Sequence, residues 1–193
     1  QLLQTVANTR RNLGLLERAL EPQREALEIR RKELGDDHAF TLASIHNLAL
    51  LLCDQGMLNE AEPLTREAVQ GYIKTLGDDH PHTLTSTNNL ALLLHDQGKY
   101  EEAEVYYTEA LEGRRRVLGD DHPNTLASIN NMGALLSKQG KYDEAMPYWV
   151  EALETRRRVL GDEHPHTLTS INNMGTLLRR QGKYDEVMPY WVE

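Results

Sequence analysis

The chain has 193 residues, of which 21 are basic and 30 acidic, giving a formal net charge of −9. This balance argues against a general nucleic-acid binder, which needs a basic face to neutralise phosphates. The single cysteine, Cys53, excludes an internal disulfide framework and fits a reducing, cytoplasmic compartment. The longest apolar run, residues 48–53, is far too short to span a bilayer, so we expect no membrane insertion.

A repeat of 42 residues organises the chain. Glycines recur at this interval in two series, at Gly35, Gly77, Gly119 and Gly161 and at Gly14, Gly56, Gly98, Gly140 and Gly182. A fixed period of this size is typical of a stacked repeat array. We expect one array with units at about 1–34, 35–76, 77–118, 119–160 and 161–193, the first divergent and the last truncated. Gln1 is not a start methionine, so we expect a piece of a longer chain.

Each unit is predicted to contain two helices. In the copy that begins at Gly119, apolar residues over 126–136 recur at the spacing of an amphipathic helix. Gly140 then suits a left-handed C-terminal position. Asp143 is expected to cap a second helix over residues 144–160, with Pro147 in its first turn. The chain is therefore predicted to be all-α.

Each turn between units carries acidic residues and a histidine, at His38, His80, His122 and His164. Histidine and aspartate are metal ligands. However, these histidines occur once per repeat, and neighbouring repeats should stack roughly 10 Å apart, too far for two to share one ion. We therefore expect no metal and no cofactor. Instead, Asp and His should cap the incoming helix, while proline sets its first turn.

Large and small residues alternate along both helices at Ile129, Met132, Gly133, Leu136, Ala145, Trp149 and Ala152. This spacing resembles the tetratricopeptide repeat. The 42-residue length, the Asn-Asn pairs, Gln-Gly-Lys-Tyr and Leu-Gly-Asp-Asp-His-Pro are similar to the kinesin light chain type. The resemblance implies a right-handed superhelical solenoid of helix-turn-helix repeats that binds a peptide in its concave groove. Trp149 and Trp191 are expected to pack between the two helices of their units.

Two internal copies, residues 119–151 and 161–193, differ at only seven aligned positions. Counting Leu126 as position 1, four differences fall at positions 2, 9, 12 and 13 of the first helix. These positions lie away from the apolar stripe, on the side that lines the groove of tetratricopeptide arrays. Specificity is therefore predicted to reside there, although drift on an exposed face would give the same pattern.

Asparagines recur on the same helix. Position 6 is Asn47, Asn89, Asn131 and Asn173, and position 5 is His46, Asn88, Asn130 and Asn172. An amide both donates and accepts, so a ladder of amides can pair with the backbone of an extended peptide. The resemblance implies the same contact. The alternative is that each amide bonds the neighbouring helix and fixes the stacking. Position 6 favours the peptide contact and position 5 the structural one.

Charge along this face is uneven. Position 13 changes from Asp54 and Asp96 to Lys138 and Arg180, and position 12 changes from Cys53 and His95 to Ser137 and Arg179. Arginine there would pair with carboxylates of an acidic peptide, as the light chain resemblance also implies. The alternative is a solvated face. The arginine triplets at 114–116 and 156–158 are expected to pair with glutamates such as Glu112 and Glu154, with a basic ridge as the alternative.

The sequence thus predicts a non-enzymatic adaptor or scaffold that binds a protein or a short, acidic, extended peptide. A second hypothesis is a structural array, such as the sensor arm of a larger signalling or NTPase protein that acts through stacking. Both ends lack a polar capping helix, which predicts end-to-end self-association. No nucleophile-elbow, phosphate-loop or paired-cysteine pattern supports catalysis.

Overall fold

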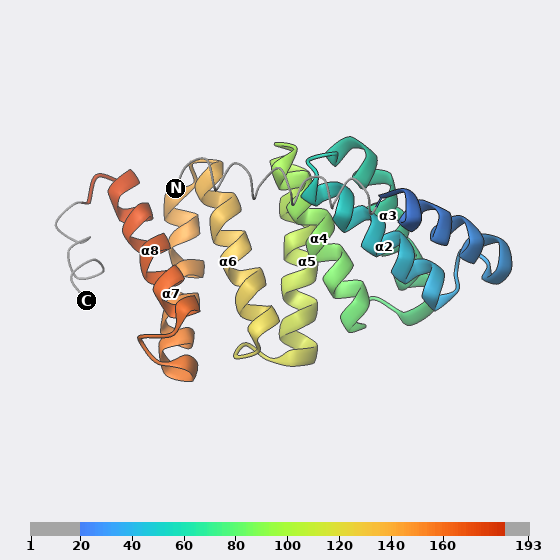
Figure 1. The fold of residues 1–193 in the computed structure, drawn as a ribbon. Coiled ribbons are helices and arrows are strands. Elements are labelled where there is room, and N and C mark those ends of the chain that lie inside the picture. Colours follow the sequence, from blue (N-terminus) through green and yellow to red (C-terminus); the bar gives the residue numbers. More distant parts are fainter. Residues whose placement is uncertain (1–19, 184–193) are drawn as a thin grey trace, which may run out of the picture. The chain divides into compact units, whose positions relative to one another are not determined.

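The structure is a computed structural model that describes residues 20–183 (Figure 1). All regular structure in this range is helical. The chain divides into two compact units, with unit 1 ending at Gln97 and unit 2 beginning at Gly98. The all-α repeat fold predicted from the sequence is confirmed. The predicted chain ends, with Trp191, lie outside the described residues.

Unit 1 contains a helical segment over residues 20–34, followed by α2 (Ala39–Asp54), α3 (Leu58–Leu76) and α4 (Pro81–Asp96). Unit 2 contains α5 (Tyr100–Leu118), α6 (Pro123–Lys138), α7 (Tyr142–Leu160) and α8 (Pro165–Arg180). In unit 1, α3 packs against α2 and α4, and in unit 2 each helix from α5 to α8 packs against the next one in the chain. We call α2, α4, α6 and α8 the A helices, and α3, α5 and α7 the B helices.

The turn between repeats is built as the sequence predicts. The Nδ1 atom of each turn histidine accepts a hydrogen bond from the amide two residues later, at 3.1–3.2 Å, in His38, His80, His122 and His164. Proline occupies the first turn of α4, α6 and α8. Since Nδ1 is the acceptor, the neutral ring carries its hydrogen on Nε2. The predicted histidine caps are confirmed.

The start of α7 differs from the prediction. The helix begins at Tyr142, and Asp143 is not its N-cap. Gly140 has φ 77° and Lys141 has φ −80°, ψ 61°, so the chain reverses within two residues and the helix starts earlier. Asp143 lies in the first turn, where its Oδ1 accepts from Gln181 Nε2 at 2.9 Å. Pro147 consequently lies in the second turn, inside the helix.

Trp149 packs between the two helices of its unit, as predicted. Its Nε1 donates to the Asn130 carbonyl oxygen at 3.3 Å, and a Cβ on Gly133 would come within 2.5 Å of Nε1. Glycine is therefore needed at Gly133 to admit the indole. Unit 2 also contains a buried hydrophobic cluster, which consists of Leu111, Leu126, Ile129 and Ala152.

The arginines that end the B helices of unit 2 bond neighbouring segments instead of their own helix. Arg115 reaches Glu151 at 2.6 Å and Asp120 at 3.1 Å, and Arg158 pairs with Asp121. The predicted pairing with Glu112 and Glu154 is wrong for these two arginines. Arg115 thus contacts the turn that follows its own helix and the neighbouring B helix, whereas Arg158 contacts the turn that precedes α6.

None of the helices over residues 20–183 combines the length and the apolar character that a membrane span requires.

Candidate functional site

The candidate site is the face of the A helices that carries positions 2, 5, 6, 9, 12 and 13. We call it the A-helix face, counting Leu42, Leu84, Leu126 and Leu168 as position 1. In unit 1, His46 at position 5 of α2 lies 3.0 Å from the Ser86 hydroxyl of α4. In unit 2, Asn173 Nδ2 donates to Asn130 Oδ1 at 2.8 Å. Neighbouring A helices of each unit thus meet along this face.

A second contact lies two turns further along the same helices of unit 2. Arg180 Nη1 donates to the Ser137 hydroxyl at 3.3 Å. Positions 5 and 12 of α6 therefore meet positions 6 and 13 of α8. This regular offset of seven residues follows from the helical period, because residues seven apart lie on one side of a helix.

The candidate residues differ in exposure. Asn88 is buried, whereas His46, Asn89, His95, Asn130, Asn131 and Asn173 are partly buried. The exposed candidates are Asn47, Asn172, Lys138, Arg179 and Arg180. The Asn130–Asn173 bond is the helix-to-helix contact that the structural alternative requires. It uses one of the two amide hydrogens of Asn173 and leaves its carbonyl oxygen for a further partner.

Cations gather on the A-helix face of unit 2. Lys138 and Arg179 have no hydrogen-bond or ion-pair partner among residues 20–183, and Arg180 bonds only the neutral Ser137 there. At position 13 of unit 1 the exposed side chains are Asp54 and Asp96 instead. Such unpaired guanidinium groups favour a carboxylate ligand, which they can bind with two parallel hydrogen bonds.

Sequence reasoning missed Arg156, the first arginine of its triplet. Its side chain is buried, with 7% exposed. Nη1 donates to Ser170 Oγ at 2.7 Å and to the His166 carbonyl at 3.2 Å, so its described partners are neutral. Burial lowers the pKa of this guanidinium. One signal in the sequence could have revealed this role: a serine at position 3 of the next A helix follows the arginine by fourteen residues. The same spacing joins Arg156 to Ser170 and Arg114 to Ser128.

Arg156 lines a cavity of about 310 Å³ at the N-terminal edge of the A helices of unit 2. We call it the unit 2 edge pocket. Its lining residues are Asp121, Pro123, Leu126, Ala127, Arg156, Val159, Leu160, His164 and His166. The carboxylate of Asp121 is paired with Arg158. A buried cation without a carboxylate partner is costly, so an anionic group in this cavity would be stabilised.

Unit 1 has a cavity of about 520 Å³ at the same repeat position. We call it the unit 1 edge pocket. Its lining residues are Asp37, His38, Ala39, Leu42, Ala43, Tyr72, Thr75, Leu76, His80 and His82. Tyr72 thus stands where unit 2 has Arg156.

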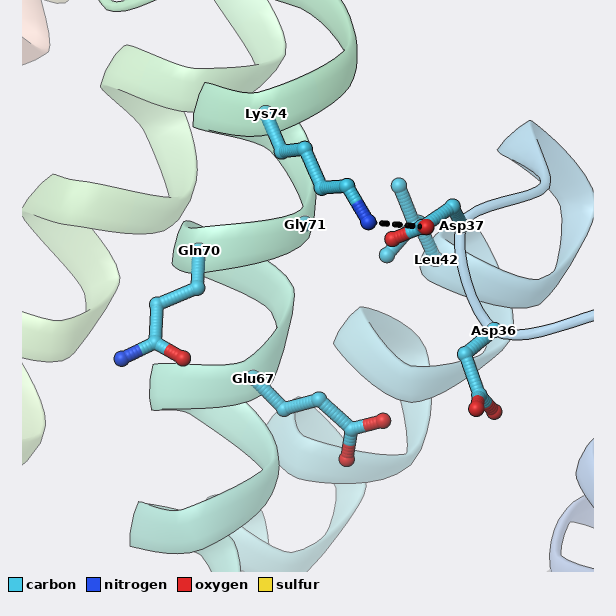
Figure 2. Close-up of a pocket in the computed structure, with 7 residues that line it drawn as sticks. All are labelled: Asp36, Asp37, Leu42, Glu67, Gln70, Gly71 and Lys74. Carbon is cyan, nitrogen blue, oxygen red and sulfur yellow. Dashed lines mark hydrogen bonds and ion pairs between the residues drawn. The ribbon is translucent and has the colours of Figure 1, made fainter.

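A smaller cleft of about 200 Å³ lies on the other side of Leu42 (Figure 2). Figure 2 shows Lys74 reaching Asp37, at 2.5 Å, while Gln70 points away from this pair. Glu67, which also lines the cleft, accepts from Arg31 at 2.6 and 2.7 Å. Because these two carboxylates already have cationic partners, the cleft is best explained as part of the packing between helices.

Two further observations concern groups that could react with a thiol reagent or bind a metal ion. Burial, with smaller effects from Asp54 and Asp96, raises the pKa of the Cys53 thiol to about 11. The thiol is therefore protonated at neutral pH, as expected of an inert side chain. Over residues 20–183, no group of three or more His, Cys, Asp or Glu side chains is placed to hold a metal ion.

Comparisons with known proteins place this geometry in a family. The family model named Tetratricopeptide repeat matches residues 1–72, 41–116, 83–148 and 127–190. No curated protein matches the chain.

Solved structures give the same result. A Podosopora anserina protein, described as a kinesin light chain with nearly identical TPR-like repeats, is 26% identical with a TM-score of 0.84, covering 96% of this chain and 88% of that one. BtubC (BKLC) from P. vanneervenii is 26% identical with a TM-score of 0.83, covering 97% and 75%. The apo form of RapI, at 16% identity and a TM-score of 0.77 over 92% and 47%, shares the fold.

Proposed function

Because the chain belongs to the tetratricopeptide repeat family, and so has the fold of a protein-interaction scaffold, we propose that its A-helix face binds a short, extended, acidic segment of another protein. The chain then acts as an adaptor, without catalytic chemistry of its own. The kinesin light chain-like neighbours support the same class of function.

The observation that carries the proposal is the set of cations on unit 2. Lys138, Arg179 and Arg180 are exposed and have no acidic partner over residues 20–183, in a chain with a net charge of −9. Several other cations are paired with carboxylates, such as Arg115 with Glu151 and Lys141 with Glu104. An acidic ligand would supply the missing carboxylates.

Two further features support an extended ligand. The asparagines at positions 5 and 6 offer amide groups to a peptide backbone, and the side chain of Asn172 is exposed. In the unit 2 edge pocket, Arg156 offers a buried cation to one ligand carboxylate. The ligand would thus contact both ends of an A helix. In a 16-residue helix such as α6 these ends lie about 24 Å apart.

The test is fluorescence anisotropy with a labelled oligoglutamate peptide and its oligoglutamine counterpart. We expect the acidic peptide to bind, and Arg180→Glu to weaken it about tenfold, since a charge-assisted hydrogen bond contributes roughly 1.5–3 kcal/mol. Asn131→Ala should weaken it less. Lys32→Glu, which reverses an exposed cation outside the A-helix face, is the matched control.

Equal binding of the two peptides, or equal losses in Arg180→Glu and Lys32→Glu, would contradict the proposal. The first result would favour the alternative of a structural array that acts through stacking.

A further inference from the structure

We propose that the A-helix face of unit 1 binds a protein segment that carries lysine or arginine, with the stem of each basic side chain on a leucine and its cation at an aspartate. The proposal rests on the proposed function, because it concerns the same face of the A helices. It adds that units 1 and 2 select segments of opposite charge.

The residues that carry this proposal lie at positions 9 and 13 of α2 and α4. Leu50 and Leu92, at position 9, are 38% and 43% exposed. Asp54 and Asp96, at position 13, are also exposed. Since the leucine and the aspartate of each helix are four residues apart, they lie on one side of it, with Cβ atoms about 6 Å apart. Each A helix of unit 1 thus presents an apolar surface one turn before a carboxylate.

The two leucine–aspartate pairs lie on neighbouring helices. His46 of α2 is 3.0 Å from the Ser86 hydroxyl of α4. Burial, and then Asp54 and Asp96, raises the pKa of the Cys53 thiol to about 11, so both carboxylates act on one group of α2. Their negative potentials therefore add on this face, which attracts a cation.

The two aspartates have no cation of their own. Neither Asp54 nor Asp96 has a hydrogen-bond or ion-pair partner among residues 20–183. Positions 2, 5, 6, 9 and 12 of α2 and α4 include no lysine or arginine. By contrast, Asp37 in the turn before α2 is already bound to Lys74 at 2.5 Å (Figure 2). A basic residue of a partner would supply the missing cation at position 13.

The leucines determine which kind of cation fits. An exposed leucine side chain is stabilised when a partner removes its apolar surface from water. Lysine and arginine lay their methylene stems along apolar surface and keep the charged head in a polar environment. Such a stem can run from the leucine to the carboxylate one turn away. A compact cation without a stem would gain nothing from Leu50 or Leu92.

Unit 2 provides the comparison within the chain. At position 9 its A helices have Ala134 and Thr176, and at position 13 they have Lys138 and Arg180. The leucine and the carboxylate are therefore replaced together. Both replacements remove a feature that suits a long basic side chain, so we expect such a segment to bind unit 1 and not unit 2.

The test is titration of capped oligolysine into the ¹⁵N-labelled full chain. An oligomer of diaminobutyrate, which has the same charge on a shorter stem, is the comparison. We expect oligolysine to bind at least about threefold more tightly than this oligomer, because its stems cover the leucines. The amide signals that should shift are those of Leu50, Asp54, Leu92 and Asp96.

Two variants introduce the residues that α8 carries at the same positions. Asp96→Arg should weaken oligolysine binding about tenfold, because it removes a charge-assisted contact and adds a like charge. Leu92→Thr should weaken it about threefold, because it removes apolar surface. The matched controls are Glu28→Arg and Ile29→Thr, since both residues are exposed and lie on the helical segment over residues 20–34, outside the A-helix face.

If Asp96→Arg fails to fold, Asp96→Asn removes the charge alone and should weaken binding in the same direction. The proposal is overturned if oligolysine shifts no signals of unit 1 or binds no better than the diaminobutyrate oligomer. It is also overturned if the controls weaken binding as much as the variants at positions 9 and 13.

A second copy of the chain is the other occupant to test, by sedimentation equilibrium of the free chain. We expect the same mass for the unchanged chain and for Asp96→Arg. A dimer that this variant dissociates would assign the face to a second copy and overturn the proposal. Oligoglutamate, titrated into the same samples, reports on unit 2, so this inference and the proposed function fail separately.

Discussion

Units 1 and 2 are built from the same 42-residue repeat, yet their A-helix faces differ in charge. At position 13, unit 1 has Asp54 and Asp96, whereas unit 2 has Lys138 and Arg180. At the edge pockets, unit 1 has Tyr72 where unit 2 has Arg156. The histidine caps at the start of the A helices are the same in both units. The A-helix face can therefore change along such an array while the turn between repeats is maintained.

The largest difference that we expect between the units is in thiol reactivity at position 12, where burial and charge act in the same direction. Cys53 in unit 1 has a pKa raised from 9.0 to about 11, first by burial and then by Asp54 and Asp96. A rise of two units in the thiol pKa lowers the fraction of thiolate at pH 8 about a hundredfold. Reaction of Cys53 with Ellman's reagent should be slower than that of a peptide cysteine by this factor.

The matched probe in unit 2 is Arg179→Cys in a Cys53→Ser background, because Arg179 is exposed and lies beside Arg180. This thiol should react at the rate of a peptide cysteine or faster. Similar rates for the two positions would contradict the raised pKa of the Cys53 thiol.

A smaller effect is expected from adding a methyl group at two buried glycines. A Cβ on Gly133 in unit 2 would lie 2.5 Å from Nε1 of the rigid Trp149 ring, while one on Gly71 in unit 1 would lie 2.2 Å from a methyl group of Leu42. The end of a leucine side chain can move more easily than an anchored indole. Gly133→Ala should therefore destabilise by about 2 kcal/mol, and Gly71→Ala by less.

Urea unfolding of both variants measures this difference. Equal midpoint shifts for Gly133→Ala and Gly71→Ala would argue that the indole is not the constraint at Gly133.

The histidine caps, Arg156 and Asp143 show how far the structure can be predicted from the sequence. The fold, the helix order and the histidine caps could be predicted, because each depends on local spacing within a repeat. The role of Arg156 could not, since its triplet looks uniform until the packing buries only the first arginine against Ser170. Asp143 was misassigned because the tight turn at Gly140 lets α7 begin earlier than capping preference alone predicts.

The candidate site was only partly predictable for the same reason. Lys138, Arg179 and Arg180 could be placed on one helix face from periodicity. The Asn130–Asn173 bond depends on how neighbouring A helices are offset, which no single helix specifies. The edge pockets require three helices at once and leave no signal in one repeat.

The smallest effect we expect is a pH dependence confined to unit 1. Burial, and to a lesser extent the nearby His82, lowers the pKa of His46, which also faces Tyr72 and Ser86. The folded state therefore disfavours the protonated ring. Unit 1 should keep its stability above the unfolded pKa of about 6.5 and lose some as the pH falls below it. Unit 2 has Asn130 at this position, which does not titrate.

Hydrogen exchange at pH 7.5 and 5.5 measures this loss of stability at low pH. The protection factors of α2 and α4 are compared with those of α6 and α8. Both units carry histidine caps, so cap effects cancel in the comparison. His46→Asn, which installs the residue found at position 5 of the other A helices, should remove the difference. A difference that persists in this variant would place its cause elsewhere.

The central claim is that an acidic extended segment binds the A-helix face of unit 2. Its most direct test is chemical-shift mapping of the oligoglutamate peptide on the ¹⁵N-labelled full chain, including the arginine side-chain Nε signals. We predict the largest shifts at Arg156, Arg179 and Arg180, with little change at Asp54 and Asp96. Shifts of equal size over both units, or confined to the exposed faces of the B helices, would contradict the claim.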